Sequence, residues 1–272
     1  MDLGLGGRTA LVTGSYRGTG AGVARVLAAE GATVLVHGLE PGQADATVAE
    51  ITAAGGRAVA VTGDLYTEAG TAQLVAEVAA LRIEGAPAHV DIVVNNWGRP
   101  EGSDWESSDS TSWHGSYDVN VVSAVRVTQA FLPAMREAGW GRVVFVSTVG
   151  ATRPGDRIPE YYAAKGALPS VTVGLAKHLA GTGVTVNCVS PGMIATDEII
   201  EMYTARAEQR GLPTDPASLG QVMLDEGMTN WSGRVCTPDD VGRFVAFVAS
   251  EAAWHLDGAH LRFDGGASDA VT

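Results

Sequence analysis

The chain has 272 residues and a net charge of −13, with 46% hydrophobic and 18% charged side chains. This length suits one large α/β domain or two small ones, and the composition is that of an ordinary globular protein. The acidic balance without a basic patch argues against nucleic acid as a partner.

Cysteine and histidine usage narrows the class further. Cys188 and Cys236 are too few for a disulfide scaffold. The histidines lack metal-ligand spacing, so no metal site is expected. The chain opens without a basic-then-apolar leader, and no segment approaches the roughly 18 apolar residues of a membrane span. We therefore expect no membrane association and a cytoplasmic protein.

Short β-branched runs alternate with longer helical stretches along the chain. The expected strands are residues 9–13, 33–36, 58–61, 91–94, 142–146, 184–189 and 259–263. The expected helices are residues 20–29, 43–54, 68–82, 112–138, 160–179 and 238–250. Most strand candidates are nearly continuous apolar runs, as expected for parallel strands covered on both faces. The alternation predicts an α/β fold: a doubly wound, Rossmann-type, seven-stranded parallel sheet flanked by helices on both faces.

The whole chain, residues 1–272, is interpreted as one domain. Residues 85–89 are expected to form a short loop rather than a linker. The segment 193–234 fits the sheet pattern poorly, because it combines helical patches with Gly211 and Pro213. We interpret it as an excursion over the carboxyl edge of the sheet, where Met223 and Trp231 could close over a ligand. A surface insertion with no role in a site is the alternative.

The first strand runs into a glycine-rich turn, Thr13-Gly14-Ser15-Tyr16-Arg17-Gly18-Thr19-Gly20. Its glycines permit tight turns and the close approach of a pyrophosphate. The helix that follows offers free N–H groups and a favourable dipole for an anion. The spacing differs from GxGxxG, so this turn is a weak signal by itself.

A second motif carries acid–base chemistry. In Tyr161-Tyr162-Ala163-Ala164-Lys165, Tyr161 and Lys165 share one helix face. A lysine beside a phenol favours the phenolate, so we expect it to lower the tyrosine pKa from about 10. Beside a nicotinamide, such a pair can reduce a carbonyl or oxidise an alcohol. Pro169 lies four residues after Lys165, and it predicts a kink or a local change of bonding beyond an intact Tyr161–Lys165 turn.

Together these motifs resemble the short-chain dehydrogenase/reductase family along nearly the whole chain, including its 3-oxoacyl-ACP reductase-like members. The glycine turn resembles the family's TGxxxGxG motif, and Asp264-Gly265-Gly266 resembles its C-terminal signature. Asn95-Asn96-Trp97-Gly98 resembles its NNAG segment, with tryptophan in place of alanine. The resemblance implies a single Rossmann-type fold, a nicotinamide cofactor and a homotetramer.

The resemblance also implies a catalytic tetrad, which is Asn120, Ser147, Tyr161 and Lys165. Tyr161 would give its proton to the substrate oxygen while Ser147 hydrogen-bonds the same atom. Lys165 would bind the nicotinamide ribose, and Asn120 would hold a water that links Lys165 to solvent. Thr148 is an alternative hydroxyl donor. Ser147 is preferred because it fits the family's Ser-x-x-Gly pattern.

The cofactor-binding residues implied by the resemblance are Gly14, Ser15, Arg17, Gly18, Thr19, Gly20, His37, Gly38, Asp64, Leu65, Asn95, Asn96, Trp97, Gly98, Tyr161, Lys165, Pro191, Gly192, Ile194 and Thr196. Gly38 takes the place of the acid that selects NAD, and Arg17 would face the 2′-phosphate of NADP, with His37 as a second donor. The usual second arginine is replaced by Leu39. NADP is therefore preferred, and NAD is the alternative.

The expected reaction is NADPH-preferring reduction of a ketone or aldehyde to an alcohol, or the reverse, by hydride transfer. The candidate substrate pocket consists of Trp97, Arg153, Tyr162 and Met193. The first alternative is an NAD-dependent alcohol or diol dehydrogenase of the same fold. The second alternative is a non-catalytic, nucleotide-sensing Rossmann protein, because fold alone does not determine activity.

Overall fold

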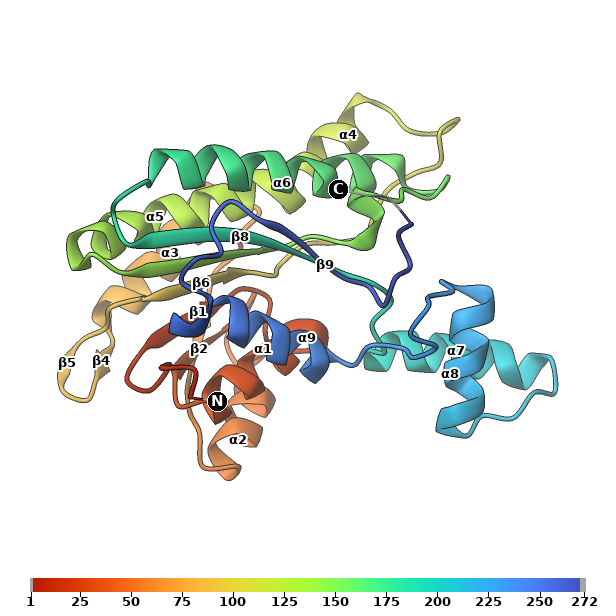
Figure 1. The fold of residues 1–272 in the computed structure, drawn as a ribbon, viewed down its shortest axis with the longest axis horizontal. Coiled ribbons are helices and arrows are strands. Elements are labelled where there is room, and N and C mark those ends of the chain that lie inside the picture. Colours follow the sequence, from red (N-terminus) through yellow and green to blue (C-terminus); the bar gives the residue numbers. More distant parts are fainter. Residues whose placement is uncertain (1, 270–272) are drawn as a thin grey trace.

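The computed structural model describes residues 2–269. Seven parallel strands form one sheet in the order β3-β2-β1-β6-β7-β8-β9 (Figure 1). They are β1 (Thr9–Val12), β2 (Thr33–Gly38), β3 (Arg57–Thr62), β6 (Ile92–Asn95), β7 (Gly141–Val146), β8 (Val184–Pro191) and β9 (His260–Phe263). The strand order reverses between β1 and β6, and in doubly wound sheets ligands bind outside the carboxyl ends at such a point.

Helices cover both faces of this sheet (Figure 1). One face carries α1 (Gly18–Ala29), α2 (Asp45–Ala53) and α9 (Pro238–Val248); the other carries α3 (Glu68–Ala80), α5 (Ser123–Ala138) and α6 (Pro159–His178). Each face has its own apolar cluster against these helices. The predicted doubly wound α/β fold is confirmed.

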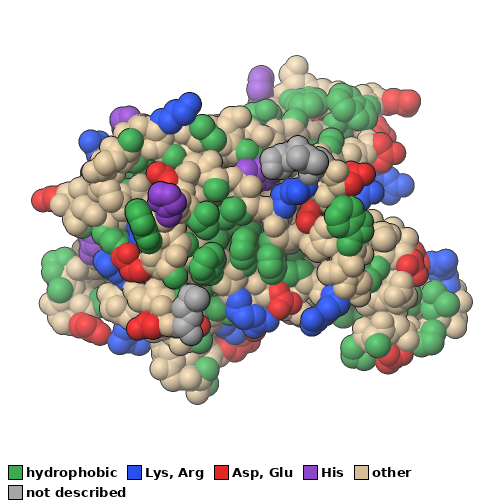
Figure 2. Space-filling model, in the orientation of Figure 1, with side chains coloured by type: hydrophobic (Ala, Val, Ile, Leu, Met, Phe, Trp, Pro, Cys, Tyr) green, Lys and Arg blue, Asp and Glu red, His purple; other side chains and the backbone are tan. Residues whose placement is uncertain are grey.

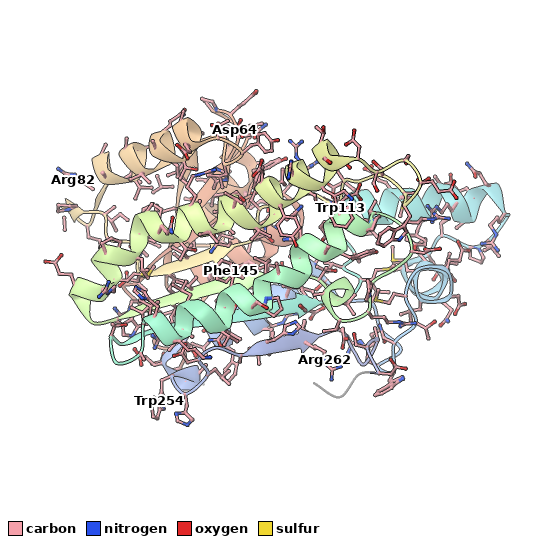
Figure 3. The ribbon with its side chains drawn as sticks, turned by 90° about the horizontal axis from the view of Figure 1, so that it is seen from above. Asp64, Arg82, Trp113, Phe145, Trp254 and Arg262 are labelled. Carbon is pink, nitrogen blue, oxygen red and sulfur yellow. The ribbon has the colours of Figure 1, made fainter. Side chains whose placement is uncertain are left out.

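Successive side chains of each buried strand point to opposite faces of the sheet, which explains the two apolar clusters. Leu11 and Phe145 face the α3–α5–α6 layer, whereas Val12 and Val146 face the α1–α9 layer. Figure 3 shows Phe145 central beneath the helices, with Arg82 and Trp254 toward the end of the molecule away from α7 and α8. Because both faces are covered, nearly continuous apolar strands are required, which is why their runs predicted the sheet well.

Two segments depart from the sequence prediction. The expected helix 112–138 is α4 (Ser110–Tyr117), a π-helical turn (Asp118–Val122) and then α5. The expected loop 85–89 belongs to a small hairpin of β4 (Arg82–Ile83) and β5 (Ala86–Pro87). The expected helix 160–179 is present as α6, which is helical from Pro159 to His178 with Pro169 inside it.

The segment 193–234 forms α7 (Asp197–Gln209) and α8 (Pro216–Glu226), which stand beyond the carboxyl ends of the strands (Figure 1). These helices share a small apolar cluster of their own, which includes Tyr203, Leu219 and Met223. Met223 is therefore a packing residue between α7 and α8, whereas Trp231 is 79% exposed.

The face drawn in Figure 2 gathers apolar side chains along its middle, over the region of α9 and β9, with charges scattered around them. In residues 2–269, no helix combines the length and the apolar character needed to cross a bilayer.

Candidate functional site

The glycine turn between β1 and α1 has the backbone that its sequence requires. Gly14 and Gly18 have φ values of 62° and 55°, a region that favours glycine. A Cβ atom on Gly20 would lie 2.6 Å from Asn96 Nδ2, so a larger residue does not fit. The first N–H groups of α1 face this turn without intrahelical partners. The turn is therefore a cradle in which backbone groups can approach a phosphate closely.

The end of β6 is tied to the same turn. Asn96 Nδ2 donates to the carbonyl oxygens of Thr13 (3.0 Å) and Gly14 (3.3 Å), and Thr13 Oγ1 accepts from the backbone N–H groups of Asn96 and Trp97. Asn95 points into the core, where its Nδ2 donates to Thr128 Oγ1 at 2.8 Å. Asn96 thus holds the cradle in shape, whereas Asn95, expected at the cofactor, ties β6 to α5 instead.

His37 and Ser15 are buried beneath the turn. His37 Nδ1 accepts from the Gly14 N–H at 3.0 Å, and its Nε2 pairs with the Gly63 carbonyl at 2.9 Å. Burial lowers the pKa of His37 to about 4, so the ring is neutral. Ser15 Oγ donates to the Val12 carbonyl and accepts from the His37 N–H. The expected role of His37 as a donor to a 2′-phosphate is wrong, because both ring nitrogens are already bonded.

Arg17 lies at the surface of the turn and pairs with Glu198 in the first turn of α7 at 3.0 Å. Gly38 ends β2, and a Cβ there would lie 3.0 Å from Gln43 Cβ. The Gln43 side chain accepts from the N–H groups of Leu39 and Glu40. The end of β2 therefore carries a glycine where a carboxylate could stand, and the N–H groups that follow it are satisfied by Gln43.

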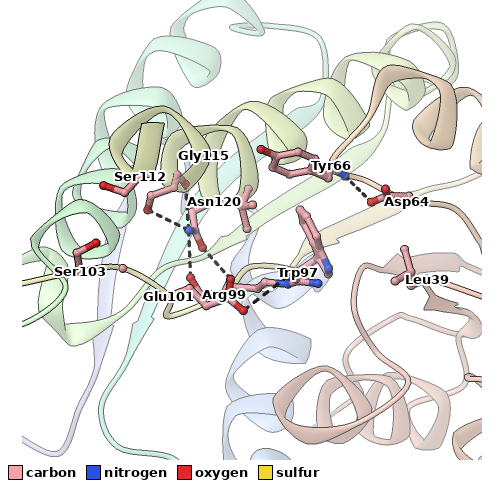
Figure 4. A pocket seen from close by; sticks show the side chains of 13 residues that line it. Leu39, Asp64, Tyr66, Trp97, Arg99, Glu101, Ser103, Ser112, Gly115 and Asn120 are labelled. Atoms are coloured by element: carbon pink, nitrogen blue, oxygen red, sulfur yellow. Dashed lines mark hydrogen bonds and ion pairs between the residues drawn. The ribbon is translucent and has the colours of Figure 1, made fainter. Parts of the chain in front are cut away.

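Beyond Gly38 lies a cavity of about 570 Å³ (Figure 4). Leu39, Asp64, Tyr66 and Trp97 line one part of it, and Asp64 Oδ1 accepts from the Tyr66 N–H at 3.0 Å. Trp97 also lies against Gly14, where an added Cβ would be 3.1 Å from its Cδ1 atom. Leu65 is buried in the core. Sequence reasoning missed Tyr66 and Arg99 here, because no motif marks them.

A second cavity, of about 280 Å³, brings most of the predicted reactive residues together. Its lining includes Thr19, Asn96, Gly98, Ser147, Thr148, Tyr161, Lys165, Pro191, Gly192, Ile194 and Thr196. They come from the carboxyl ends of β6, β7 and β8, from α1, and from α6. Residues far apart in the sequence therefore form one polar site at the sheet edge.

Lys165 is buried, and its Nζ donates to the Val146 carbonyl at 2.9 Å. Burial lowers the pKa of Lys165 to about 8. Burial also raises the pKa of Tyr161 to about 12; the adjacent Tyr162 acts in the same direction, and a hydrogen bond with the Thr148 side chain opposes both. The expectation that Lys165 lowers the Tyr161 pKa is therefore wrong for this structure, and Tyr161 is a protonated phenol.

Ser147 is 6% exposed, and its Oγ donates to the Lys165 main-chain carbonyl at 2.8 Å. Pro169 has no N–H, so it cannot make the helical hydrogen bond that this carbonyl normally accepts. Ser147 supplies that missing donor. The local change of bonding expected from Pro169 is thus present, and the Tyr161–Lys165 turn is intact.

Asn120 lies in the π-helical turn, a feature common at functional sites. Its Oδ1 accepts from the Arg99 N–H at 3.1 Å, and its Nδ2 donates to the carbonyls of Ser116 (3.0 Å) and Arg99 (3.2 Å) (Figure 4). A Cβ on Gly98 would lie 2.6 Å from Asn120 Oδ1 and 3.0 Å from Lys165 Nζ. Gly98 therefore allows Asn120 and Lys165 to approach each other.

The four residues expected to form the substrate pocket lie in different parts of the structure. Tyr162 packs its ring against Gly150 and Gly155, and Arg153 donates to the Ala267 carbonyl at 2.6 Å. Met193 packs against the α7–α8 cluster. Trp97 borders the larger cavity. These side chains thus do not form a common wall around Tyr161.

Comparison with known proteins agrees with this architecture. The family model for short chain dehydrogenases matches residues 8–207. D-beta-hydroxybutyrate dehydrogenase from Cupriavidus necator is 35% identical over 263 residues, covering 96% of this chain and 98% of the relative.

Two solved structures are also similar. L-sorbose reductase from Gluconobacter frateurii, complexed with NADPH and L-sorbose, has a TM-score of 0.89 at 27% identity, with 100% of both chains covered. A 3-oxoacyl (acyl-carrier-protein) reductase from Agrobacterium tumefaciens with NADP bound has a TM-score of 0.84 at 33% identity, covering 97% of this chain and 96% of that one. The chain therefore belongs to the short-chain dehydrogenase/reductase family of NAD(P)-dependent oxidoreductases that act on CH–OH groups.

Proposed function

We propose that this protein reduces a small ketone or aldehyde with NADPH as the preferred cofactor, and that Tyr161 is the general acid. The observation that carries the proposal is the cavity in which Tyr161, Lys165 and Thr148 meet the glycine cradle at the carboxyl edge of the sheet. A buried phenol with a pKa of about 12 stays protonated at neutral pH, which suits a proton donor.

The cofactor fits the residues present. Gly14, Gly18 and Gly20 leave room for a pyrophosphate against the N-terminus of α1, and Asp64 borders the cavity beyond Gly38 where an adenosine would lie. When bound, the reduced nicotinamide supplies a hydride to the carbonyl carbon. Pro191, Gly192, Ile194 and Thr196 line the cavity on the side of β8, and these residues would hold the carboxamide.

The chain's own residues then protonate and hydrogen-bond the oxygen of the substrate carbonyl. Tyr161 gives its proton to the developing alkoxide, and a neighbouring hydroxyl hydrogen-bonds the same oxygen. Lys165 would turn from the Val146 carbonyl to the cofactor ribose, and Asn120 holds the backbone of Arg99 through its N–H and carbonyl groups. Ser147 is the tetrad hydroxyl, although its proton is engaged by the Lys165 carbonyl.

The preference for NADPH rests on Arg17 and on Gly38. Arg17 is at the turn with its guanidinium exposed, and Gly38 replaces the carboxylate that would bond the ribose of NAD. The NADPH and NADP bound in the two similar structures support the same choice. NAD remains the competing cofactor, because Leu39 stands where a second arginine would be expected.

We also propose a single-domain, cytoplasmic homotetramer. β9 is one of the two edge strands of the sheet, and apolar side chains gather over β9 and α9 (Figure 2). Phe244 and Phe263 stack there with their centroids 4.7 Å apart, and both stay partly exposed. An apolar patch on an edge strand favours pairing between copies. Light scattering coupled to gel filtration should give four times the chain mass, and a monomer would contradict this.

The activity is tested by following reduced-nicotinamide absorbance with NADPH and NADH separately. The panel should include 3-oxo acids, ketoses and oxo-sugar acids, because the relatives are named for a hydroxybutyrate, a ketose and gluconate. Turnover with NADPH exceeding that with NADH supports the proposal. Faster turnover with NADH would contradict the NADPH preference inferred from Arg17. Tight NADPH binding without any turnover would favour a nucleotide-sensing protein.

A further inference from the structure

The chain that follows β9 is anchored to the ends of β8 and β9. Residues 264–268, the C-terminal segment, turn on Asp264, whose carboxylate accepts from the N–H groups of Gly266 and Ser268, both at 3.0 Å. Arg262 in β9 donates to the Ser268 carbonyl at 3.2 Å. A Cβ on Gly192 would lie 3.1 Å from Asp264 Cα, so the segment packs closely against the end of β8.

The C-terminal segment is also tied to the chain that follows α8. The Ser232 N–H donates to the Gly265 carbonyl at 2.9 Å. The Trp231 ring lies against Gly266, where an added Cβ would be 2.6 Å from its Cε3 atom. Ala267 is buried, as are Asp264 and Ser268. A buried segment that is bonded to several elements is a firm anchor for whatever else it contacts.

The loop between β7 and α6 is bonded to this anchor by two side chains. Arg153 Nη1 donates to the Ala267 carbonyl at 2.6 Å, and Thr152 Oγ1 lies 3.1 Å from Ser268 Oγ. Thr152 Oγ1 gives its single proton to the Val149 carbonyl at 3.2 Å, so Ser268 is the donor in the bond between the two hydroxyls. Arg153 and Ser268 therefore join the loop to the C-terminal segment.

The same loop encloses the ring next to the reactive phenol. The Tyr162 ring lies between Gly150 and Gly155: a Cβ on Gly150 would overlap it, and one on Gly155 would be 3.3 Å from its Cε2 atom. The ring centroids of Tyr162 and Tyr161 are 5.6 Å apart. Because closely packed side chains transmit displacements, a shift of the loop would move Tyr161 through Tyr162.

We propose that the C-terminal segment positions Tyr161 by holding the β7–α6 loop, with Arg153 and Ser268 as the positioning residues. Arg153 acts through the loop, since it bonds Ala267 instead of lining the cavity that holds Tyr161. The inference rests on the proposed carbonyl reduction, in which Tyr161 must lie within hydrogen-bond reach of the substrate oxygen. A displacement of about 1 Å at such a group can cost up to about 10²-fold in rate.

The test compares Arg153→Ala with Arg153→Lys, which keeps a donor, and with Ser268→Ala, which removes the second bond. Arg157→Ala, at an exposed arginine of the same loop, is the matched control. The kinetic readouts are kcat and KM on the carbonyl substrate that the wild type turns over best, with the Kd for NADPH from fluorescence titration. Hydrogen–deuterium exchange at the amides of residues 149–153 reports how firmly the loop is held.

We expect Arg153→Ala to exchange about fivefold faster at the loop amides, as for the loss of one hydrogen bond, and to lose about tenfold in kcat. Its Kd for NADPH should be unchanged. Arg153→Lys should keep most of the rate, Ser268→Ala should lose part of it, and Arg157→Ala should match the wild type.

Four results would overturn the inference. They are a wild-type kcat in Arg153→Ala, unchanged exchange at its loop amides, an equal loss in Arg157→Ala, and an equal loss in Arg153→Lys. A Kd for NADPH that rises in proportion to the loss of kcat would also overturn it, because a distorted cofactor site would then explain the loss.

Failure of this inference can be told from failure of the proposed function. If the wild type turns over, Tyr161→Phe does not, and Arg153→Ala matches the wild type, the inference fails and the function stands. If the wild type binds NADPH but reduces no carbonyl in the panel, the proposed function fails and the inference fails with it.

Discussion

The Ser147 hydroxyl donates to the main-chain carbonyl of Lys165, and this 2.8 Å bond links the end of β7 to the helix that carries Tyr161. Pro169 explains why the bond forms, since a residue with an N–H at that position would supply the helical partner itself. A helix-breaking residue type is thereby accommodated inside a continuous helix.

Pro169→Ala should restore the helical N–H and release the proton of Ser147. We expect Pro169→Ala to raise kcat by up to about tenfold, because Ser147 becomes able to donate to the substrate oxygen. Val173→Ala, at an exposed position on the same helix, is the matched control. An unchanged kcat in Pro169→Ala would contradict the assigned role of Pro169.

Gly98→Ala should disturb the reactive centre directly. The added methyl group would lie 2.6 Å from Asn120 Oδ1 and 3.0 Å from Lys165 Nζ, so one of these groups must move. We expect a loss of about 1–3 kcal/mol in unfolding free energy and a raised KM for NADPH. Gly174→Ala in α6 is the control, since nothing lies within 4 Å of its Cβ position. Equal kinetics for the two variants would argue against close packing at Gly98.

His37 should make stability depend on pH. Its pKa is about 4 in the folded protein against a usual 6.5, because burial disfavours the charged ring. The unfolded chain therefore binds more protons below pH 6.5, and stability falls as the pH drops from 6.5 toward 4. The displacement corresponds to about 3 kcal/mol.

The measurement is urea unfolding of wild type and His37→Gln at several pH values in this range, with the exposed His255→Gln as control. His37→Gln should be less stable at pH 7, because it loses the bonds to Gly14 and Gly63, yet its stability should fall less steeply with acid. Parallel pH curves for wild type and His37→Gln would show that His37 does not titrate as assigned.

Arg17 and Glu198 should affect the two cofactors differently. Arg17→Ala should raise the Kd for NADPH by about tenfold and leave that for NADH nearly unchanged, since it removes a charge-assisted bond to the 2′-phosphate. Glu198→Ala releases Arg17 from an exposed ion pair and should tighten NADPH binding modestly. Equal effects of Arg17→Ala on both cofactors would remove Arg17 from the phosphate site.

Much of the fold could be predicted from sequence because the strands are apolar on both faces. The predicted runs 9–13, 91–94 and 142–146 marked the carboxyl edge, and the polar residues after two of them, Asn96 and Ser147, meet there. The π-helical turn at Asp118–Val122 and the β4–β5 hairpin carry no comparable pattern.

The finer assignments needed tertiary structure. By its place in the sequence, at the end of the second strand, His37 is a candidate hydrogen-bond donor to a phosphate. Its burial between Gly14 and Gly63 becomes visible only once β1, β2 and β3 lie side by side. Likewise, the bond from Ser147 to Lys165 and the ion pair of Arg17 with Glu198 join residues distant in the chain. No local spacing encodes these contacts, so motif matching gives residue types but not their hydrogen-bond partners.

The most direct test of the account is the rate of NADPH oxidation by Tyr161→Phe, with the Kd for NADPH measured on the same preparation. Phenylalanine keeps the ring and removes the proton donor. We predict a loss of at least about 10³-fold in kcat, with an unchanged Kd. A Tyr161→Phe enzyme that keeps the wild-type rate would show that the proton comes from another group and would contradict the proposed mechanism.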